Sequence, residues 1–319
     1  MKKLRQLLIV VLAFTMCVAL SSCGEKELAE SIKVGSLVGP TGMGLIDLMD
    51  DEKIDVELYQ NPTDAVQKLI SGDIDIACVP SNLGGVLYNK TQGNIQVLTT
   101  IVNGVLYIVE NGESVKTIND LKGTTIYGSG KGGTPEYALQ ALLENAGLQI
   151  GKDVQVEWLD SHATVAQKVA STAGAIGLLP EPQVSAITMK NKNVKVALDL
   201  NSAWQDMTGQ ELPMGILIAK KNFVESRSDD LAVFLDEVFA SIEDVQTASD
   251  EVVEKIVNAG IIGEAALAKA AIPNCSLIAY SGDDTKAAIS AFYDKLFKLA
   301  PASIGGAMPE DDFYYGVTK

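Results

Sequence analysis

The chain has 319 residues and a formal net charge of −16 at neutral pH, from 25 Lys and Arg against 41 Asp and Glu. So acidic a surface argues against nucleic-acid binding and against attachment to anionic lipid through basic patches. The single histidine, His162, excludes a multi-histidine metal site, and no nucleophile motif lies beside it. We therefore expect no enzyme activity, no cofactor and no metal. The chain is long enough to form two hydrophobic cores.

The beginning of the chain has the pattern of a bacterial export signal. Basic residues precede an apolar stretch at 7–20, which is too short for a comfortable membrane span. The sequence Leu-Ser-Ser-Cys-Gly that follows resembles the lipobox of bacterial lipoproteins, in which the signal is cut before an acylated cysteine; a plain secretory signal is the alternative. We expect a signal peptide at 1–22, a lipid anchor on Cys23 at the extracytoplasmic face of the cell membrane, and a polar tether at 23–30.

From Ser31 onward strand-like and helix-like segments alternate, which is typical of α/β units with a mostly parallel sheet. The first series has expected strands at 32–38, 56–59, 74–79, 95–102 and 105–110, with helices at 43–49 and 63–70 and a helical segment that ends at 90. The second series has a short helix at 117–121, a strand from 124, helices at 134–146, 162–171 and 183–190, and strands at 154–159, 175–179 and 194–198. A strand at 214–220 then leads into a helical tail at 234–245, 252–259, 265–271 and 286–299.

The two series resemble each other where their strands end. An apolar strand runs into proline and then a helix at both 74–80 and 175–180, and a strand runs into a glycine-rich turn at both 36–44 and 126–133. Ligands of open α/β sheets lie outside the carboxyl ends of the strands. The repeat therefore predicts two lobes that face each other across a cleft lined by these loops.

The glycine-rich loop of the second series is the strongest candidate for a ligand contact. It precedes a helix in which Thr134 stands where an N-cap is expected and proline follows at the first helical position. Unpaired N–H groups at such a helix start can cradle an anion or a carbonyl oxygen, although an ordinary strand–loop–helix connection has the same pattern. The candidate contacts in this loop are Ser129, Gly132, Gly133 and Thr134, and Lys131 is the only cation of the candidate loops.

Other candidates lie at strand ends, near an expected crossing between lobes or in the stretch 201–213, which is expected to be a long loop: Pro40, Thr41, Gly42, Ser81, Asn82, Thr100, Asn103, Glu181 and Trp204. All but Thr100 and Asn103 have a structural alternative. The group at 40–42 would form a tight turn, Ser81, Asn82 and Glu181 would cap helices, and Trp204 would pack beneath its loop instead of stacking on an aromatic ligand. His162 is expected at the surface or near a helix cap.

Three segments carry a family resemblance: GDIDIACVPSN, DLKGTTIYGSGKGGTPEYALQALLENAGL and GAIGLLPEP. They resemble substrate-binding proteins of bacterial ABC importers, within these the nitrate/sulfonate/taurine and pyrimidine-precursor branch, over nearly the whole chain from about Ser31. The resemblance implies a two-lobed α/β fold, the periplasmic-binding-protein-like fold of type II, with two crossings between lobes. We place lobe 1 at 31–109 plus 219–319 and lobe 2 at 110–218. The implied partners of this monomer are a small-molecule ligand and a membrane permease with its ATPase.

The candidate loops contain no arginine, which departs from relatives that bind strong oxyanions through Arg clamps. We therefore expect a small neutral or zwitterionic ligand, and an aromatic molecule is among those that the loops would accept. Two alternatives to a transport protein stay open: an enzyme of the same fold in pyrimidine or menaquinone-precursor synthesis, and a ligand-sensing lipoprotein without a transporter. Cys78 and Cys275 are either buried free thiols or a disulfide.

Overall fold

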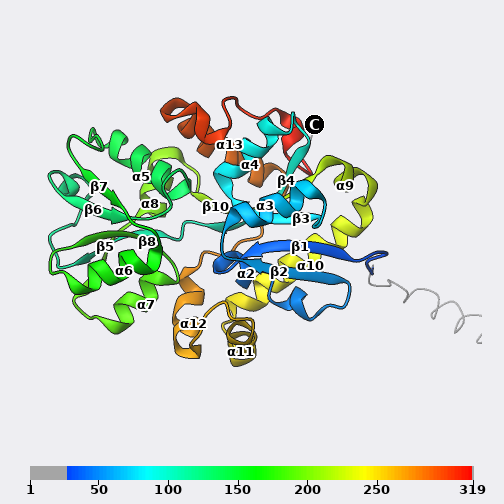
Figure 1. Cartoon of the computed structure of the whole chain (residues 1–319), viewed down its shortest axis with the longest axis horizontal. Coiled ribbons are helices and arrows are strands. Elements are labelled where there is room, and N and C mark those ends of the chain that lie inside the picture. Colours follow the sequence, from blue (N-terminus) through cyan, green and yellow to red (C-terminus); the bar gives the residue numbers. More distant parts are fainter. Residues whose placement is uncertain (1–26, 318–319) are drawn as a thin grey trace, which may run out of the picture.

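The computed structural model describes residues 27–317, so the predicted signal peptide and Cys23 lie outside the described residues. The chain forms two five-stranded sheets flanked by helices, with strand orders β2-β1-β3-β10-β4 and β7-β6-β8-β5-β9. Figure 1 shows the two sheets side by side along the longest axis of the molecule. The α/β architecture predicted from the alternating pattern is confirmed.

The first sheet contains four strands that run in one direction and a fifth, from later in the chain, that runs against them. Strand β1 pairs in parallel with β2 and β3, whereas β10 is antiparallel to β3 and β4. The bounds are β1 (Ile32–Leu37), β2 (Ile54–Tyr59), β3 (Ile76–Pro80), β4 (Ile95–Asn103) and β10 (Pro213–Lys220), with helices α2 (Pro40–Met43), α3 (Pro62–Ser71) and α4 (Ser81–Lys90). Helix α3 shows why these segments form: proline opens it, Ala65 and Leu69 bury one face, and Gly72 ends it with a φ of 88°.

The second sheet repeats this arrangement. Strand β6 is parallel to β7 and β8, and β5 is antiparallel to β8 and β9, so β5 holds the place that β10 holds in the first sheet. The bounds are β5 (Leu106–Asn111), β6 (Thr125–Gly128), β7 (Gln155–Trp158), β8 (Ile176–Pro180) and β9 (Val194–Asp199), with helices α5 (Thr134–Asn145), α6 (His162–Ser171), α7 (Gln183–Lys190) and α8 (Leu200–Thr208). The prediction of a loop at 201–213 was wrong for its first half, which forms α8. The Asp199 carboxylate starts this helix because it accepts from the N–H groups of Asn201 and Ser202.

The C-terminal third returns to the first sheet and covers both of its faces. Residues of α10 and α11 belong to the apolar cluster that contains β1 and α2, whereas α13 packs with α4, β4 and β10. The bounds are α9 (Lys221–Ser226), α10 (Ser228–Gln246), α11 (Asp250–Asn258), α12 (Ala265–Ala271), α13 (Gly282–Leu299), and the short 3-10 helices η4 (Pro301–Ile304) and η5 (Asp311–Phe313). No helix within residues 27–317 is long and apolar enough to cross a membrane.

The hydrophobic core does not divide cleanly between the two sheets. One cluster lies under the first sheet and a small one under the second, but a third is continuous between them through α5, α8 and α13. Its centre is the edge-to-face pair of Trp204 and Phe292, with ring centroids 5.6 Å apart. The two halves are therefore held together on one side by apolar packing.

The crossings between the sheets come before β5 and before β10. The sequence-based division at 109/110 and 218/219 differs from this sheet membership by a few residues, because the apolar runs at 106–109 and 213–218 complete the sheet that they enter. The cysteines, for which the sequence left two alternatives, are free and buried. Burial raises the pKa of the Cys78 thiol to about 12.

Candidate functional site

The starts of α4 and α5, one from each half, meet at the carboxyl ends of their sheets. The Thr134 hydroxyl donates to Asn82 Oδ1 at 3.2 Å, and both side chains are about 1% exposed. Asn82 Nδ2 in turn donates to the backbone carbonyl of Ser303 at 3.3 Å. Two of the predicted site residues are thus brought into direct contact, and two helix N-termini with their partial positive charge face the same place.

Several described residues have a buried side-chain polar atom without a hydrogen-bond partner, and two of them adjoin this contact. Within residues 27–317 they are Ser36 Oγ, Ser81 Oγ, Thr100 Oγ1, Asn103 Oδ1, Trp204 Nε1 and Ser303 Oγ. A buried polar group without a hydrogen bond costs about 1–3 kcal/mol, so such groups are expected where a ligand completes the bonding. Ser81 and Ser303 are the two that adjoin Asn82, and of these only Ser81 was predicted.

The predicted capping role of Thr134 was wrong. Gly133 occupies the N-cap position in extended backbone and Thr134 is the first helical residue, so its hydroxyl is free to reach Asn82. The N–H of Gly132 instead donates to the Glu136 carboxylate at 2.5 Å. Gly132 has a φ of 79°, which glycine adopts readily and other residues do not.

Ser129 and His162 form a second polar pair, within the second half. Ser129 Oγ lies 2.6 Å from His162 Nδ1, and Ser129 is 3% exposed at the end of β6. His162 is the first residue of α6 and half-buried, so burial lowers its pKa and keeps the ring neutral at pH 7. The sequence placed His162 at the surface or a cap; its position directly after a strand of the second series is the signal that could have identified this contact.

Glu181 has the capping role that was its structural alternative. Its carboxylate accepts from the N–H and the hydroxyl of Ser185, each at 3.0 Å, and its own N–H donates to the Val105 carbonyl at 2.9 Å. The side chain is 4% exposed, and this burial raises its pKa. A ligand contact by Glu181 stays a prediction.

Asn103 lies at the first crossing, where three segments are tied together. Its amide donates to a Glu211 carboxylate oxygen, and the Tyr280 hydroxyl donates to the same oxygen at 3.0 Å. The next residue, Gly104, donates to the Leu212 carbonyl at 2.9 Å, and a Cβ there would lie 2.0 Å from Asn201. Sequence reasoning missed Glu211 and Tyr280, because nothing local distinguishes them from other exposed polar residues.

The remaining candidates, near Pro40 and at Thr100 and Trp204, lie in tightly packed parts of the structure. The Thr41 hydroxyl donates to the Leu37 carbonyl at 3.1 Å, and a Cβ at Gly42 would lie 2.8 Å from that same oxygen. The segment that Pro40 opens is the short helix α2 and not a simple tight turn. Thr100 is buried in β4. Trp204 is fully buried against α13, which is its packing alternative.

Comparison with known proteins gives the same fold. Putative binding protein YtlA from Bacillus subtilis is 23% identical over 245 residues, which cover 72% of this chain and 71% of that protein. An ABC transporter structure from Parabacteroides distasonis has a TM-score of 0.76 at 24% identity, covering 89% of this chain and 98% of the other. The periplasmic aliphatic sulphonate binding protein SsuA from Escherichia coli has a TM-score of 0.71 at 16% identity, covering 87% and 96%.

A Candida albicans gene product with the generic periplasmic binding protein fold has a TM-score of 0.59 at 18% identity, covering 89% of this chain and 92% of that one. The predicted periplasmic-binding-protein fold is therefore confirmed. The model of a family described as "ABC transporter, phosphonate, periplasmic substrate-binding protein" matches residues 49–235, more than half of the chain. Because this is not the nitrate/sulfonate/taurine and pyrimidine-precursor branch, that branch stays a prediction. The chain belongs to the family of periplasmic substrate-binding proteins of phosphonate ABC transporters.

Proposed function

We propose that this protein is a lipid-anchored solute-binding protein that captures a small molecule between two lobes and delivers it to the permease of an ABC transporter. Family membership supports the transport role. The observation that carries the position of the site is the Asn82–Thr134 hydrogen bond, because it joins helix starts from the two halves beside the unpartnered Ser81 hydroxyl. The ligand stabilises the closed arrangement of the lobes, which the permease then recognises.

The ligand presents an oxygen-rich polar group to hydroxyls and backbone N–H groups. The starts of α4 and α5 supply these donors, and helix N-termini bind such groups without a cationic side chain. Arg227 is the one arginine within residues 27–317, and it is bonded to Asp230 far from these helix starts. Phosphonate in the family description and sulphonate in the Escherichia coli relative suggest an organic oxyanion, whereas the arginine-free loops favour a neutral or zwitterionic molecule.

The direct experiment is mass spectrometry of small molecules released from freshly purified, denatured protein, followed by calorimetric titration with the molecule identified. Lys131→Ala reports the ligand charge: little change in affinity indicates a neutral ligand, and a marked loss indicates an anionic one. Catalytic turnover of the identified molecule would overturn the transport role in favour of an enzyme. Absence of any bound or titratable molecule would overturn the ligand site.

The anchor is tested separately. Since Cys23 stands in the acylation position of the lipobox, Cys23→Ala is expected to leave the protein without lipid, either uncleaved or released from the membrane. The measurement is the intact mass of the protein in membrane and soluble fractions. A variant that remains on the membrane with the normal mature mass would contradict lipidation at this residue.

A further inference from the structure

A tyrosine of α13 reaches into the first turn of α4, the helix that begins at the proposed ligand site. The Tyr293 hydroxyl donates to the Ser81 carbonyl at 2.7 Å and accepts from the Gly85 N–H at 2.7 Å. These two backbone groups are four residues apart and are the pair that an α-helix normally joins to each other. The hydroxyl therefore bridges one step of the helix, and a side chain inserted at such a step alters the course of the helix.

The sequence of α4 leaves room for this ring. Gly84 and Gly85 lie inside a helix of ten residues, although glycine is a poor helix former. A Cβ at Gly84 would lie 3.0 Å from Tyr293 Oη, and a Cβ at Gly85 would lie 3.1 Å from Tyr293 Cε2. Tyr293 is fully buried, and this burial raises its pKa, so the hydroxyl keeps the proton that it donates. The two glycines are thus explained by the close approach of Tyr293.

Packing that involves both halves of the molecule holds Tyr293 in place. The preceding residue, Phe292, packs edge-to-face on Trp204 of α8 in the second half. The Tyr293 ring itself stacks on Phe313, with ring centroids 6.1 Å apart. The position of the hydroxyl is therefore fixed relative to both sheets.

The turn that Tyr293 contacts carries side chains of the proposed site. Ser81 Oγ is buried without a partner, and Asn82 accepts from the Thr134 hydroxyl of the second half at 3.2 Å. Asn82 Nδ2 donates to the carbonyl of Ser303, which lies in η4 directly after α13. One segment, α13 with η4, thus contacts both the backbone and a side chain at the start of α4.

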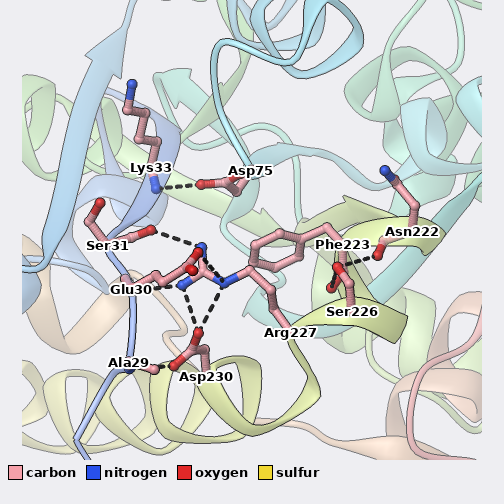
Figure 2. Close-up of polar contacts among 10 residues, drawn as sticks. All are labelled: Ala29, Glu30, Ser31, Lys33, Asp75, Asn222, Phe223, Ser226, Arg227 and Asp230. Carbon is pink, nitrogen blue, oxygen red and sulfur yellow. Dashed lines mark hydrogen bonds and ion pairs between the residues drawn. The ribbon is translucent and has the colours of Figure 1, made fainter.

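The C-terminal third also binds the first sheet at its opposite end. Figure 2 shows Arg227 there, which donates to the carbonyls of Glu30 at 2.6 Å and Ser31 at 2.9 Å. These residues enter β1 at its amino end, whereas α4 follows the carboxyl end of the parallel strand β3. Since Leu28 is also buried, the tether expected at 23–30 ends before Leu28. The Arg227 contact supports the fold far from the site and provides a comparison for Tyr293.

We propose that Tyr293 is a positioning residue of the ligand site: it holds the first turn of α4 so that Asn82 meets Thr134. This rests on the proposed function, which places the ligand between the starts of α4 and α5. Without the hydroxyl, the Ser81 carbonyl and the Gly85 N–H have only each other as partners, and the turn tightens. Asn82 then no longer meets Thr134 in the same geometry. A tyrosine with a purely structural role would stabilise the protein independently of that contact.

The experiment is a double-mutant cycle on the protein without ligand, measured by denaturant unfolding. Thr134→Ala is made in the parent and in Tyr293→Phe, which keeps the ring and removes only the hydroxyl. We expect the shift of the unfolding midpoint caused by Thr134→Ala to fall to less than half in the Tyr293→Phe background, because the contact is already weakened there. Equal shifts in the two backgrounds, including no shift in either, would overturn the proposal.

Two control backgrounds separate positioning from a general loss of stability. Tyr314→Phe is matched, since Tyr314 packs on Phe313 with ring centroids 5.0 Å apart and its hydroxyl is bonded to Ser290 Oγ at 3.0 Å. Arg227→Lys loses the forked contact with two carbonyls at the opposite end of the sheet. In both, the shift caused by Thr134→Ala is expected to equal the shift in the parent. A shift that is halved in the controls as well would overturn the proposal.

Gly85→Ala reaches the same turn from the other side. Its Cβ would lie 3.1 Å from the Tyr293 ring, so it displaces the ring while the hydroxyl is still present. The shift caused by Thr134→Ala is expected to fall in this background too, and should Tyr293→Phe not fold, an undiminished shift here would overturn the proposal. Because no ligand is present, a negative result removes the role of Tyr293 alone. The proposed function falls separately, if the parent binds no molecule.

Discussion

The two halves of the molecule have the same strand order but treat their buried polar groups differently. In the first half, Ser36, Ser81 and Thr100 keep hydroxyls without a partner. In the second half, Ser129 is paired with His162, and Glu181 is paired with Ser185. Within residues 27–317, Trp204 Nε1 is the one unpartnered buried side-chain atom that the second sheet and its helices contribute.

This difference indicates a division of labour. Groups with unused hydrogen bonds gain the most from a ligand, whereas groups already bonded to each other hold a fixed geometry at little further gain. We therefore expect the first half to supply most of the binding energy for a ligand, and the second half to supply a prearranged surface. The halves meet where Thr134 reaches Asn82.

The largest expected effect is on Trp204, the exception in the second half. Trp204→Ala removes a fully buried ring packed against Phe292 and is expected to lower the free energy of unfolding by about 3–5 kcal/mol. Denaturant unfolding measures this. Trp204→Phe is the control, because it keeps an aromatic ring and removes only the N–H. If the Trp204→Phe protein folds but no longer binds ligand, the Trp204 N–H donates to the ligand. The second half would then also contribute unused hydrogen bonds, which would contradict the difference between the halves.

Gly132 tests whether the glycine-rich loop of the second half lines the site. Gly132→Val forces a positive φ on valine, a strain of about 1–2 kcal/mol, and places bulk where the ligand approaches. Gly174→Val is matched, since Gly174 has a φ of 74° and equally free space but lies at the amino end of β8. We expect both variants to lose similar stability, and only Gly132→Val to lose ligand binding in calorimetric titration. Parent-like binding by Gly132→Val would remove this loop from the site.

Two serines in the first turns of the equivalent helices α4 and α7 sharpen the comparison. Ser81 follows β3 with an unpartnered hydroxyl, and Ser185 follows β8 with a hydroxyl bonded to Glu181 at 3.0 Å. Ser81→Ala is expected to weaken ligand binding by about 1 kcal/mol and leave stability unchanged. Ser185→Ala is expected to lower stability by about 1 kcal/mol and leave affinity unchanged. Thermal unfolding and calorimetry of both variants give the answer, and the reverse pattern would contradict the division of labour.

The smallest effect expected is a pH dependence from Glu181. Because burial raises its pKa above the ordinary 4.5, the folded protein binds this proton more tightly than the unfolded chain does. The resulting stabilisation is complete below the unfolded pKa and is lost as pH rises through the folded pKa. The free energy of unfolding of the parent, relative to Glu181→Gln, is therefore expected to fall as the pH rises from the ordinary pKa of 4.5 through the raised pKa of the folded protein. A constant difference across this range would show that Glu181 is not desolvated.

The sequence predicts the repeated strand–helix units well, because proline and glycine mark their ends. Pro80 and Pro180 close equivalent strands, and Gly72 ends α3 where it was expected. The start of α8 was missed since its cap, Asp199, also completes β9, and local patterns do not separate the two roles. The strand at 106–109 was expected, but its sheet was missed, because either sheet would accept the same apolar run.

For the site, sequence reasoning finds residues near strand ends but not their partners. Asn82 and Thr134 are 52 positions apart and meet only because two lobes face each other. The partners of Ser129 and Asn103, which are His162 and Glu211, are ordinary polar residues until the fold places them. A position after a strand, such as that of His162, is a local signal that a polar residue faces the site, but it does not identify the residue's partner. Helix starts and turns, in contrast, have local sequence signals.

The contact between Asn82 and Thr134 offers the most direct test of the proposed ligand site. The measurement is the ligand affinity of the parent, Asn82→Ala, Thr134→Ala and the double variant, by calorimetric titration. We predict that each single change weakens binding about tenfold and that the two are coupled by at least about 0.5 kcal/mol, because both side chains act on one ligand. Unchanged affinity in both single variants, with the fold intact, would contradict a ligand site between the starts of α4 and α5.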